Sequence, residues 1–264
     1  MRRTMAVGFL ALMTTLAGAQ ATASDAPQEV IANGGLIHTL MAAPVVGQPY
    51  SAMQVRRIKR VLADGTRISH HGHHSVARDS AGRVRVERRM EEAQNGQPET
   101  VMVFVLDPVA HTMMIWTTGP RTTKVATLIR LPEKKEAAKP AAEKQQAAED
   151  SRPQPVVTTE DLAPDTLQGL PVTVRKVTTV VPIGRSGNDA PITKIHETWT
   201  SPDLKLVMKE QWEDPRSGEQ TVELDPFSRA EPDPALFRAP AGYSVKDVRQ
   251  TLKELQERLD QMSN

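Results

Sequence analysis

The feature that most restricts the fold of this chain is a succession of short β-forming runs separated by turn signals, which starts near residue 51. The first two runs flank Asp64-Gly65, a dipeptide typical of hairpins with a type I′ turn. Further runs follow other Gly-, Pro- and Asp-containing turns. Such a succession with short turns predicts an antiparallel meander. The runs of this first part are 53–62, 67–78, 83–90, 100–106, 112–117 and 122–128.

The first hairpin allows a testable register. If Ala63 pairs with Thr66, Val61 lies opposite Ile68 and Arg56 lies opposite His73, because the two strands run antiparallel. One face of the hairpin is then mostly apolar, whereas the other is polar. The polar face would carry Arg56, Arg60, Ser69, His71, His73 and Ser75.

The β-forming pattern is interrupted by a segment without large apolar residues. Between residues 132 and 155 the chain consists of Ala, Lys, Glu, Gln, Pro and a few other polar residues, a composition that cannot support a packed core. We therefore predict a flexible, low-complexity insertion at about 131–157. The β pattern resumes at 170–181, 192–200, 205–212 and 219–224. Neither half alone supplies enough apolar strands, so we expect one continuous sheet in a single β domain over residues 24–243.

The last segment, residues 244–264, has the pattern of an amphipathic α-helix. Ser244 to Asp247 resembles a capping box, and apolar residues then recur at spacings of three and four. Such a stripe either packs on the sheet or forms a surface for a partner helix or for self-association. The residues of the stripe are Val245, Val248, Leu252, Leu255, Leu259 and Met262.

The N-terminal residues indicate export. Arg2 and Arg3 precede an apolar run over 5–18 that is too short to span a bilayer, and small residues follow it. We expect a Sec-type signal peptide over residues 1–23, with cleavage after Ala19 or Ala23, and a periplasmic or secreted protein. Removing Arg2 and Arg3 changes the formal net charge from +1 to −1, which does not favour nucleic-acid binding. No later segment reaches transmembrane length.

The chain contains no cysteine, which excludes disulfides, thiol catalysis and cysteine-based zinc sites. Four of its seven histidines lie within residues 70–74. His71 and His73 would share a strand face and are the only metal-ligand candidates. Two ligands are too few for a zinc site, and the register above places Arg56 across from His73. His70 and His74 would lie on the opposite face, so we predict no metal site.

Other chemistry-bearing patterns are also missing from the sequence. It has no Gly-x-Ser-x-Gly elbow, no His-Glu-x-x-His and no phosphate-binding glycine-rich loop, so we predict no catalytic and no cofactor-binding residues. Carboxylates that alternate along the later strands are typical of a solvated face, although they could line a cleft. The aromatic and methionine residues are expected in the core, with an apolar pocket as the alternative. The carboxylates are Glu197, Glu210 and Glu223, and the apolar set comprises Trp116, Trp199, Trp212, Phe104, Phe227, Met102, Met113, Met114 and Met208.

Several phrases resemble an uncharacterised family of exported bacterial proteins, among them "GQPYSA" at 47–52, "ARDSAGRVRVE" at 77–87, "LDPVAHT" at 106–112, "WTSPDLKLVM" at 199–208 and "AEPDPALFRAPAGY" at 230–243. The closing Phe237-x-x-Pro240-x-Gly242-Tyr243 is similar, more remotely, to the end of domains with the lipoprotein-carrier fold (LolA-like or RseB-like). This second resemblance implies a curved antiparallel sheet, an open half-barrel. No catalytic residue is carried over from either group.

The sequence therefore predicts a mainly β protein with a curved antiparallel sheet, a low-complexity internal loop and a C-terminal α-helix. The half-barrel resemblance implies a noncatalytic envelope protein that binds an apolar, lipid-like ligand or a protein segment on its concave sheet. The alternative is a periplasmic hydrolase or metal-dependent enzyme with a loop-borne site. We expect no cofactor.

Overall fold

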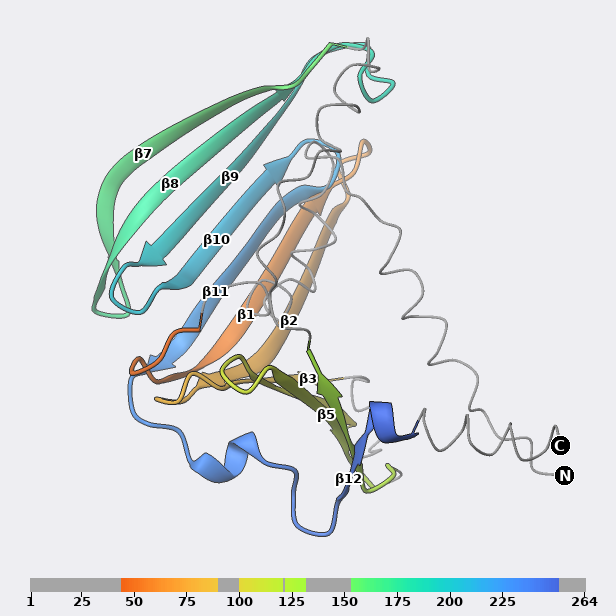
Figure 1. Ribbon diagram of the computed structural model, residues 1–264. Helices are drawn as coiled ribbons and strands as arrows, with labels where there is room; N and C mark the ends of the chain where they lie inside the picture. The colour runs from red at the N-terminus through yellow and green to blue at the C-terminus, as the bar shows by residue number, and fades with distance from the viewer. Residues whose placement is uncertain (1–43, 90–99, 121, 132–152, 252–264) are drawn as a thin grey trace, which may run out of the picture. The chain divides into compact units, whose positions relative to one another are not determined.

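The computed structural model describes residues 44–89, 100–120, 122–131 and 153–251, all of which belong to one compact unit that spans Ala42–Asn264. These residues form a curved, unclosed sheet of 12 strands (Figure 1). The mainly β fold with a curved sheet is thus confirmed. The strands are β1 (Tyr50–Val61), β2 (Arg67–Arg78), β3 (Val84–Arg89), β4 (Val101–Asp107), β5 (Thr112–Thr118), β6 (Val125–Arg130), β7 (Val156–Leu167), β8 (Leu170–Val181), β9 (Ile192–Ser201), β10 (Leu206–Asp214), β11 (Gly218–Ser228) and β12 (Ser244–Asp247).

The sheet consists of two antiparallel meanders joined by one pair of strands. Its order is β12-β6-β5-β4-β3-β2-β1-β11-β10-β9-β8-β7, so β1–β6 form one half and β7–β11 the other. Antiparallel pairing of β1 with β11 connects the halves, which confirms the expected continuous sheet. The short β12 at the edge pairs in parallel with β6, and it is the one parallel strand among the described residues.

The predicted register of the first hairpin is wrong by one residue. Val61 pairs with Arg67, Arg56 with Gly72 and Val55 with His73. The turn has a three-residue loop rather than a two-residue one, because Leu62 N donates to Thr66 O at 2.8 Å and Gly65 adopts a φ of 84°. A type I turn followed by a residue in the left-handed conformation gives this arrangement. Asp-Gly is compatible with this three-residue loop as well as with the predicted two-residue type I′ turn.

Strand β7 was not expected from the sequence. It begins at Val156, inside the predicted insertion, and pairs with β8 along most of its length. Nearly all of its residues are exposed, because it forms an edge of the sheet and has only one neighbouring strand. Residues 132–152, which make up most of the predicted insertion, lie outside the described residues.

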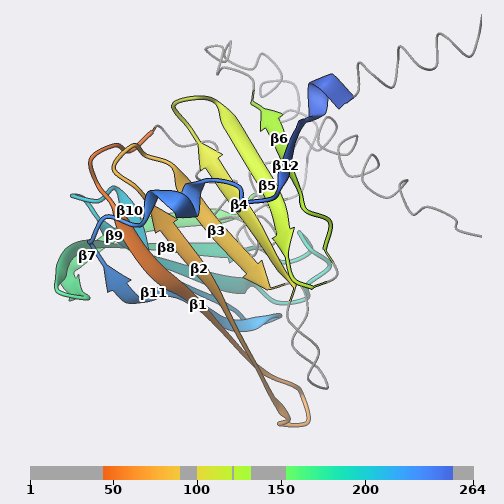
Figure 2. The same ribbon diagram turned by 90° about the horizontal axis from the view of Figure 1, so that it is seen from below.

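The predicted helix start at Ser244 is also wrong. Ser244 does not cap a helix; its backbone N–H donates to Lys124 O at 2.9 Å, and residues 244–247 form β12 beside β6 (Figure 2). A helix begins only at residue 248 and is described as far as 251. Val245, the first residue of the predicted stripe, is exposed on β12. The rest of the stripe from Leu252 onward lies outside the described residues.

The two faces of the sheet can be followed from strand to strand through the register. We call one the Trp116 face, because Trp116 shares it with its cross-strand neighbours Val103 and Glu87, and with Ser75 and Met53 beyond them. We call the other the Trp212 face. Trp212 lies opposite Gln220, and Ile58 and His70 continue this row.

Two clusters of buried residues form the core. One surrounds Leu204 and Met208 near the ends of β8–β11 and β1, and the other surrounds Trp116 on the Trp116 face. The second cluster includes Phe237, which belongs to the short 3-10 helix η2 (Pro234–Phe237). The segment from β11 to β12 is held further along by Tyr243, whose hydroxyl donates to Thr117 O at 2.8 Å. The C-terminal segment therefore covers part of the Trp116 face (Figure 2).

A buried arginine connects the two halves of the sheet. Arg78 at the end of β2 is 5% exposed, and its guanidinium lies over the Tyr50 ring, 5.0 Å from the centroid. It donates from Nε to Gln48 O at 2.9 Å and from Nη2 to Leu204 O at 2.7 Å. Two carbonyl acceptors and an aromatic face compensate the cost of burying this charge.

Candidate functional site

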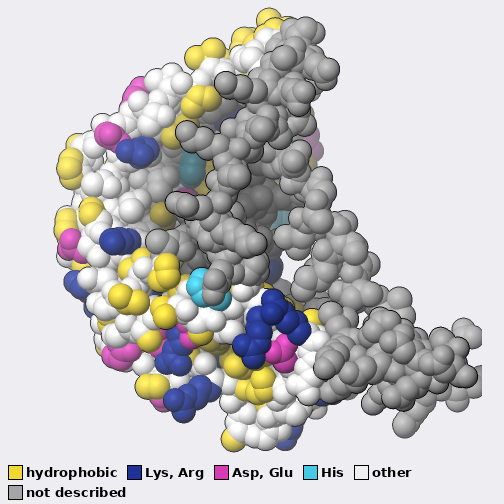
Figure 3. Space-filling model, viewed as in Figure 1, with side chains coloured by type: hydrophobic (Ala, Val, Ile, Leu, Met, Phe, Trp, Pro, Cys, Tyr) yellow, Lys and Arg dark blue, Asp and Glu magenta, His cyan; other side chains and the backbone are white. Residues whose placement is uncertain are grey.

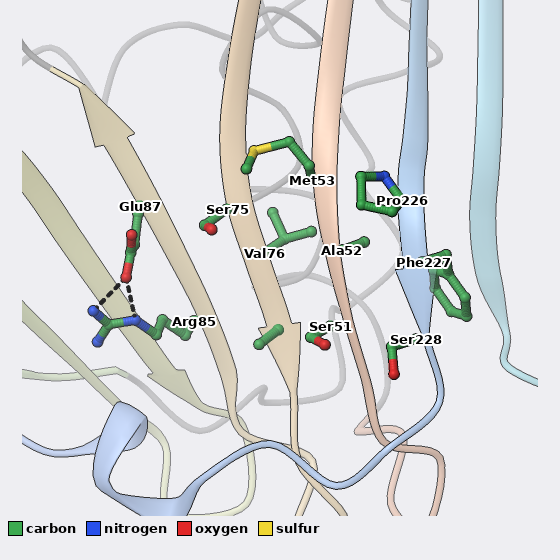
Figure 4. A pocket seen from close by; sticks show the side chains of 11 residues that line it. Ser51, Ala52, Met53, Ser75, Val76, Arg85, Glu87, Pro226, Phe227 and Ser228 are labelled. Atoms are coloured by element: carbon green, nitrogen blue, oxygen red, sulfur yellow. Dashed lines mark hydrogen bonds and ion pairs between the residues drawn. The ribbon is translucent and has the colours of Figure 1, made fainter.

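The Trp116 face has a hollow beside the C-terminal segment. Its volume is about 320 Å³, and it lies where β1, β2, β3 and β11 run side by side (Figure 4). Apolar and hydroxyl-bearing side chains line it, together with one arginine and one glutamate. The lining residues are Ser51, Ala52, Met53, Ser75, Val76, Ala77, Arg85, Glu87, Pro226, Phe227 and Ser228.

Small side chains at neighbouring positions create the hollow. Ser51 pairs with Ala77 on one side and with Ser228 on the other, while Ser75 pairs with Met53. Residues that are directly opposite in a sheet share a face, so these short side chains lie next to one another. Larger residues at these positions would fill the space with their own side chains.

The wall formed by β3 is an internally paired arginine and glutamate. Arg85 donates to Glu87 Oε1 from Nε at 2.9 Å and from Nη2 at 2.6 Å, and Figure 4 shows this pair beside Ser75. Arg85 Nη1 also donates to Leu236 O at 2.5 Å, and the guanidinium lies 5.4 Å from the centroid of the Trp116 ring. Because the charges compensate each other, this wall is polar but requires no counterion from a ligand.

The wall formed by β11 contains a β-bulge. The register between β1 and β11 shifts between Ala52 and Gln54, which leaves Asp225 and Pro226 opposite Met53. Such a bulge bends the strand locally and changes the direction of its side chains. Pro226 is thereby placed at the border of the hollow, on the side of Met53 (Figure 4).

The histidines considered as metal ligands do not line the hollow, and His73 lies two residues from Ser75 on the same strand face. His71 and His73 are exposed on the Trp116 face, near the middle of β2. Figure 3 shows one face of the molecule, with histidine side chains in cyan. His70 and His74 lie on the opposite face, as expected; His74 is half-buried and His70 is exposed. The part of the chain that the structure describes contains no group of three or more His, Asp or Glu residues arranged to hold a metal ion.

The three carboxylates do not converge. Glu223 forms an ion pair with Arg57, Glu197 lies 3.8 Å from Lys176 Nζ, and Glu210 lies 3.6 Å from His196 Nε2. The register places Glu210 on the Trp212 face and the other two on the Trp116 face. They therefore do not form a catalytic pair.

Most of the large apolar residues belong to the core, as expected. Trp116, Met208, Trp199 and Trp212 are buried, and only Phe227 of the aromatic residues considered lines the hollow. Sequence reasoning missed Ser51, Ser75, Ala77 and Ser228. Their only signal was a recurrence of small residues at alternate strand positions, whose meaning depends on the register.

Comparisons with known proteins give weak structural matches. No family model and no curated protein matches this chain. An uncharacterised conserved protein from Thermus thermophilus has 13% identity and a TM-score of 0.38, over 76% of this chain and 90% of that one. MucB, in a complex with MucA(peri), has 12% identity and a TM-score of 0.31, over 78% and 59%. A putative outer membrane lipoprotein-sorting protein domain from Vibrio parahaemolyticus has 9% identity and a TM-score of 0.18, over 72% and 89%.

None of the described helices within residues 44–251 has both the length and the apolar character needed to cross a bilayer.

Proposed function

We propose that this chain is a noncatalytic binding protein of the bacterial envelope that holds an apolar, lipid-like ligand in the hollow of the Trp116 face. The observation that carries the proposal is the hollow itself. Its volume of about 320 Å³ lies at the lower end of the range typical of small-molecule sites. Met53 and Pro226 provide apolar surface, and the serine hydroxyls provide hydrogen-bonding groups for a polar end of the ligand.

The composition of the lining favours binding over catalysis. The residues that line the hollow include serines but no histidine, and the carboxylate of Glu87 is engaged with Arg85. A serine nucleophile requires an adjacent base within hydrogen-bonding reach. The signal-like residues at the N-terminus support a location in the envelope, where lipids are abundant.

The test combines ligand extraction with a pair of matched variants. The mature, tag-free protein is purified without detergent, its bound lipids are identified by mass spectrometry, and binding of a fluorescent fatty acid is titrated. Ser75→Phe fills the hollow from β2, whereas Ser69→Phe places the same side chain on the same strand and face at an exposed position. We expect Ser75→Phe to weaken binding by about tenfold or more and Ser69→Phe to leave it unchanged.

Two results would contradict the proposal. One is an extract without lipid together with no saturable binding of the fatty acid. The other is binding that both phenylalanine variants reduce equally, since this would show that the fatty acid adheres to the surface rather than to the hollow. Melting temperatures of both variants confirm that each remains folded.

A further inference from the structure

Three basic side chains meet on the Trp212 face, opposite the proposed ligand hollow. Arg56 lies on β1 opposite Gly72, and His74 lies on β2 two residues further along the same face. The register of β2 with β3 continues from Ser75 and Glu87 to place Arg88 next to His74. Side chains from three adjacent strands therefore share one small area of the sheet.

Two nitrogen atoms in this group are buried without a hydrogen-bond partner. Arg56 uses Nη2 to donate to Gln220 Oε1 at 2.8 Å, but its Nε has no partner. The Nδ1 atom of His74 is buried and has none either. A buried donor without an acceptor costs free energy, so a partner for these two atoms would stabilise the folded protein.

The charges in this group are not compensated by the described residues. No carboxylate among them forms an ion pair with Arg56 or Arg88. Burial, and then the charge of Arg88, lower the pKa of Arg56. Burial also lowers the pKa of His74, as do Arg88, His73 and Arg56. Arg56 and Arg88 thus repel each other in the ligand-free protein, and an anion between them would relieve this repulsion and favour the protonated form of His74.

Gly72 leaves space beside these groups. A Cβ atom built at this position has no heavy atom within 4 Å, and the backbone there does not require glycine. Glycine weakens a strand interior, and it often marks a place where a ligand or another backbone approaches closely. Here its effect is an opening directly opposite Arg56, between His70 and His74 on the same face.

We propose that Arg56, His74 and Arg88 form a binding site for a phosphate-type oxyanion, entered through the opening at Gly72. A phosphate group offers several acceptor oxygens and up to two negative charges, which suits donors that arrive from three strands. The guanidinium Nε of Arg56 would supply the buried donor and Arg88 the exposed one. This site is separate from the proposed lipid hollow, because it lies on the other face.

The test uses inorganic phosphate with the mature protein, measured by isothermal titration calorimetry. Arg56→Gln removes one donor group. Arg57→Gln is the matched control, since it makes the same change at the adjacent residue, which points to the Trp116 face and pairs with Glu223. Gly72→Val retains all charges but fills the opening. We expect Arg56→Gln and Gly72→Val to weaken phosphate binding by about tenfold, and Arg57→Gln to change it less than about twofold.

The source of the phosphate group is distinguished with vesicles of phosphatidylcholine, prepared with and without phosphatidic acid. If the protein binds the phosphatidic acid vesicles and Arg56→Gln abolishes this binding, the ligand is a lipid headgroup. If the protein binds inorganic phosphate but not these vesicles, the ligand is a free anion. The proposal is overturned if neither probe binds, or if Arg56→Gln and Arg57→Gln reduce binding equally. Neither result bears on fatty-acid binding at the opposite face.

Discussion

The junction between the two halves of the sheet makes a sharp prediction about Gly218. This residue begins β11 with a φ of 89°, a conformation that costs an L-residue ~1–2 kcal/mol. A Cβ atom at this position would overlap Lys59 O and lie 3.0 Å from Arg60 Cα, both backbone atoms of β1. Because neither can rotate away, Gly218→Ala must separate β11 from β1 or distort the turn.

The cost of this close approach can be separated from the cost of the backbone conformation. Gly65 has a similar φ of 84° in the β1–β2 turn, but a Cβ atom there meets nothing within 4 Å. Gly65→Ala should therefore lower the free energy of unfolding by ~1–2 kcal/mol. Gly218→Ala should lower it by a further ~1–3 kcal/mol, the usual cost of overpacking. For a unit of this size that difference corresponds to about 2–12 °C in melting temperature.

The measurement is urea denaturation of both variants, followed by circular dichroism, with thermal melts as a second probe. Equal slopes would show that the variants unfold in the same manner as the parent protein, so that midpoints report stability. If Gly65→Ala and Gly218→Ala destabilise the protein equally, the close contact between β11 and β1 does not exist in solution. The joining of the two meanders through this pair would then have to be reconsidered.

Three other contacts can be tested in the same way. Burial raises the pKa of Asp214, but hydrogen bonds from Arg216 outweigh this effect and hold the pKa below its usual value. Asp214→Asn should therefore lower the free energy of unfolding by ~1–3 kcal/mol at pH 7. In urea melts at a series of pH values, this loss of stability should become smaller as the pH falls through the lowered pKa. His71→Ala should leave the zinc affinity of the tag-free protein unchanged in calorimetry, and loss of a stoichiometric, submicromolar site would contradict this. Cleavage at a protease site engineered within 132–152 should leave two fragments that co-elute under native conditions, because β1 pairs with β11; separate folded fragments would refute it.

Local signals were sufficient for most strands but not for their register. Strand β8 was predicted with its bounds, since alternating Val and Thr residues and flanking turns determine it locally. The β1–β2 register was wrong because two-residue and three-residue loops both use Asp-Gly, and they differ by one residue. Because of this one-residue difference, the cross-strand partner of Arg56 is Gly72 instead of the predicted His73, and the basic residues that neighbour one another on each face also differ.

The missed strands depend on distant partners rather than on their own composition. The polar sequence of β7, with Pro164 and several acidic residues, resembles a loop, and β8 supplies the pairing that makes it a strand. The residues from Ser244 to Asp247 resemble a helix cap, but Lys124 O, directly before β6, accepts a hydrogen bond from Ser244 N, and the strand β12 forms instead. In both places a tertiary hydrogen-bonding partner overrides the local preference.

The candidate site was not predictable for the same reason. Ser51, Ser75 and Ala77 come from the first hairpin, whereas Ser228 comes from the end of the second meander. Each small residue taken alone is typical of an ordinary exposed or half-buried strand position. Only the pairing of β1 with β11 brings them onto one face, and only the bulge at Pro226 leaves room between them. A hollow of this kind is a property of register, so a perturbation of that register, such as Gly218→Ala, should weaken fatty-acid binding as well as stability.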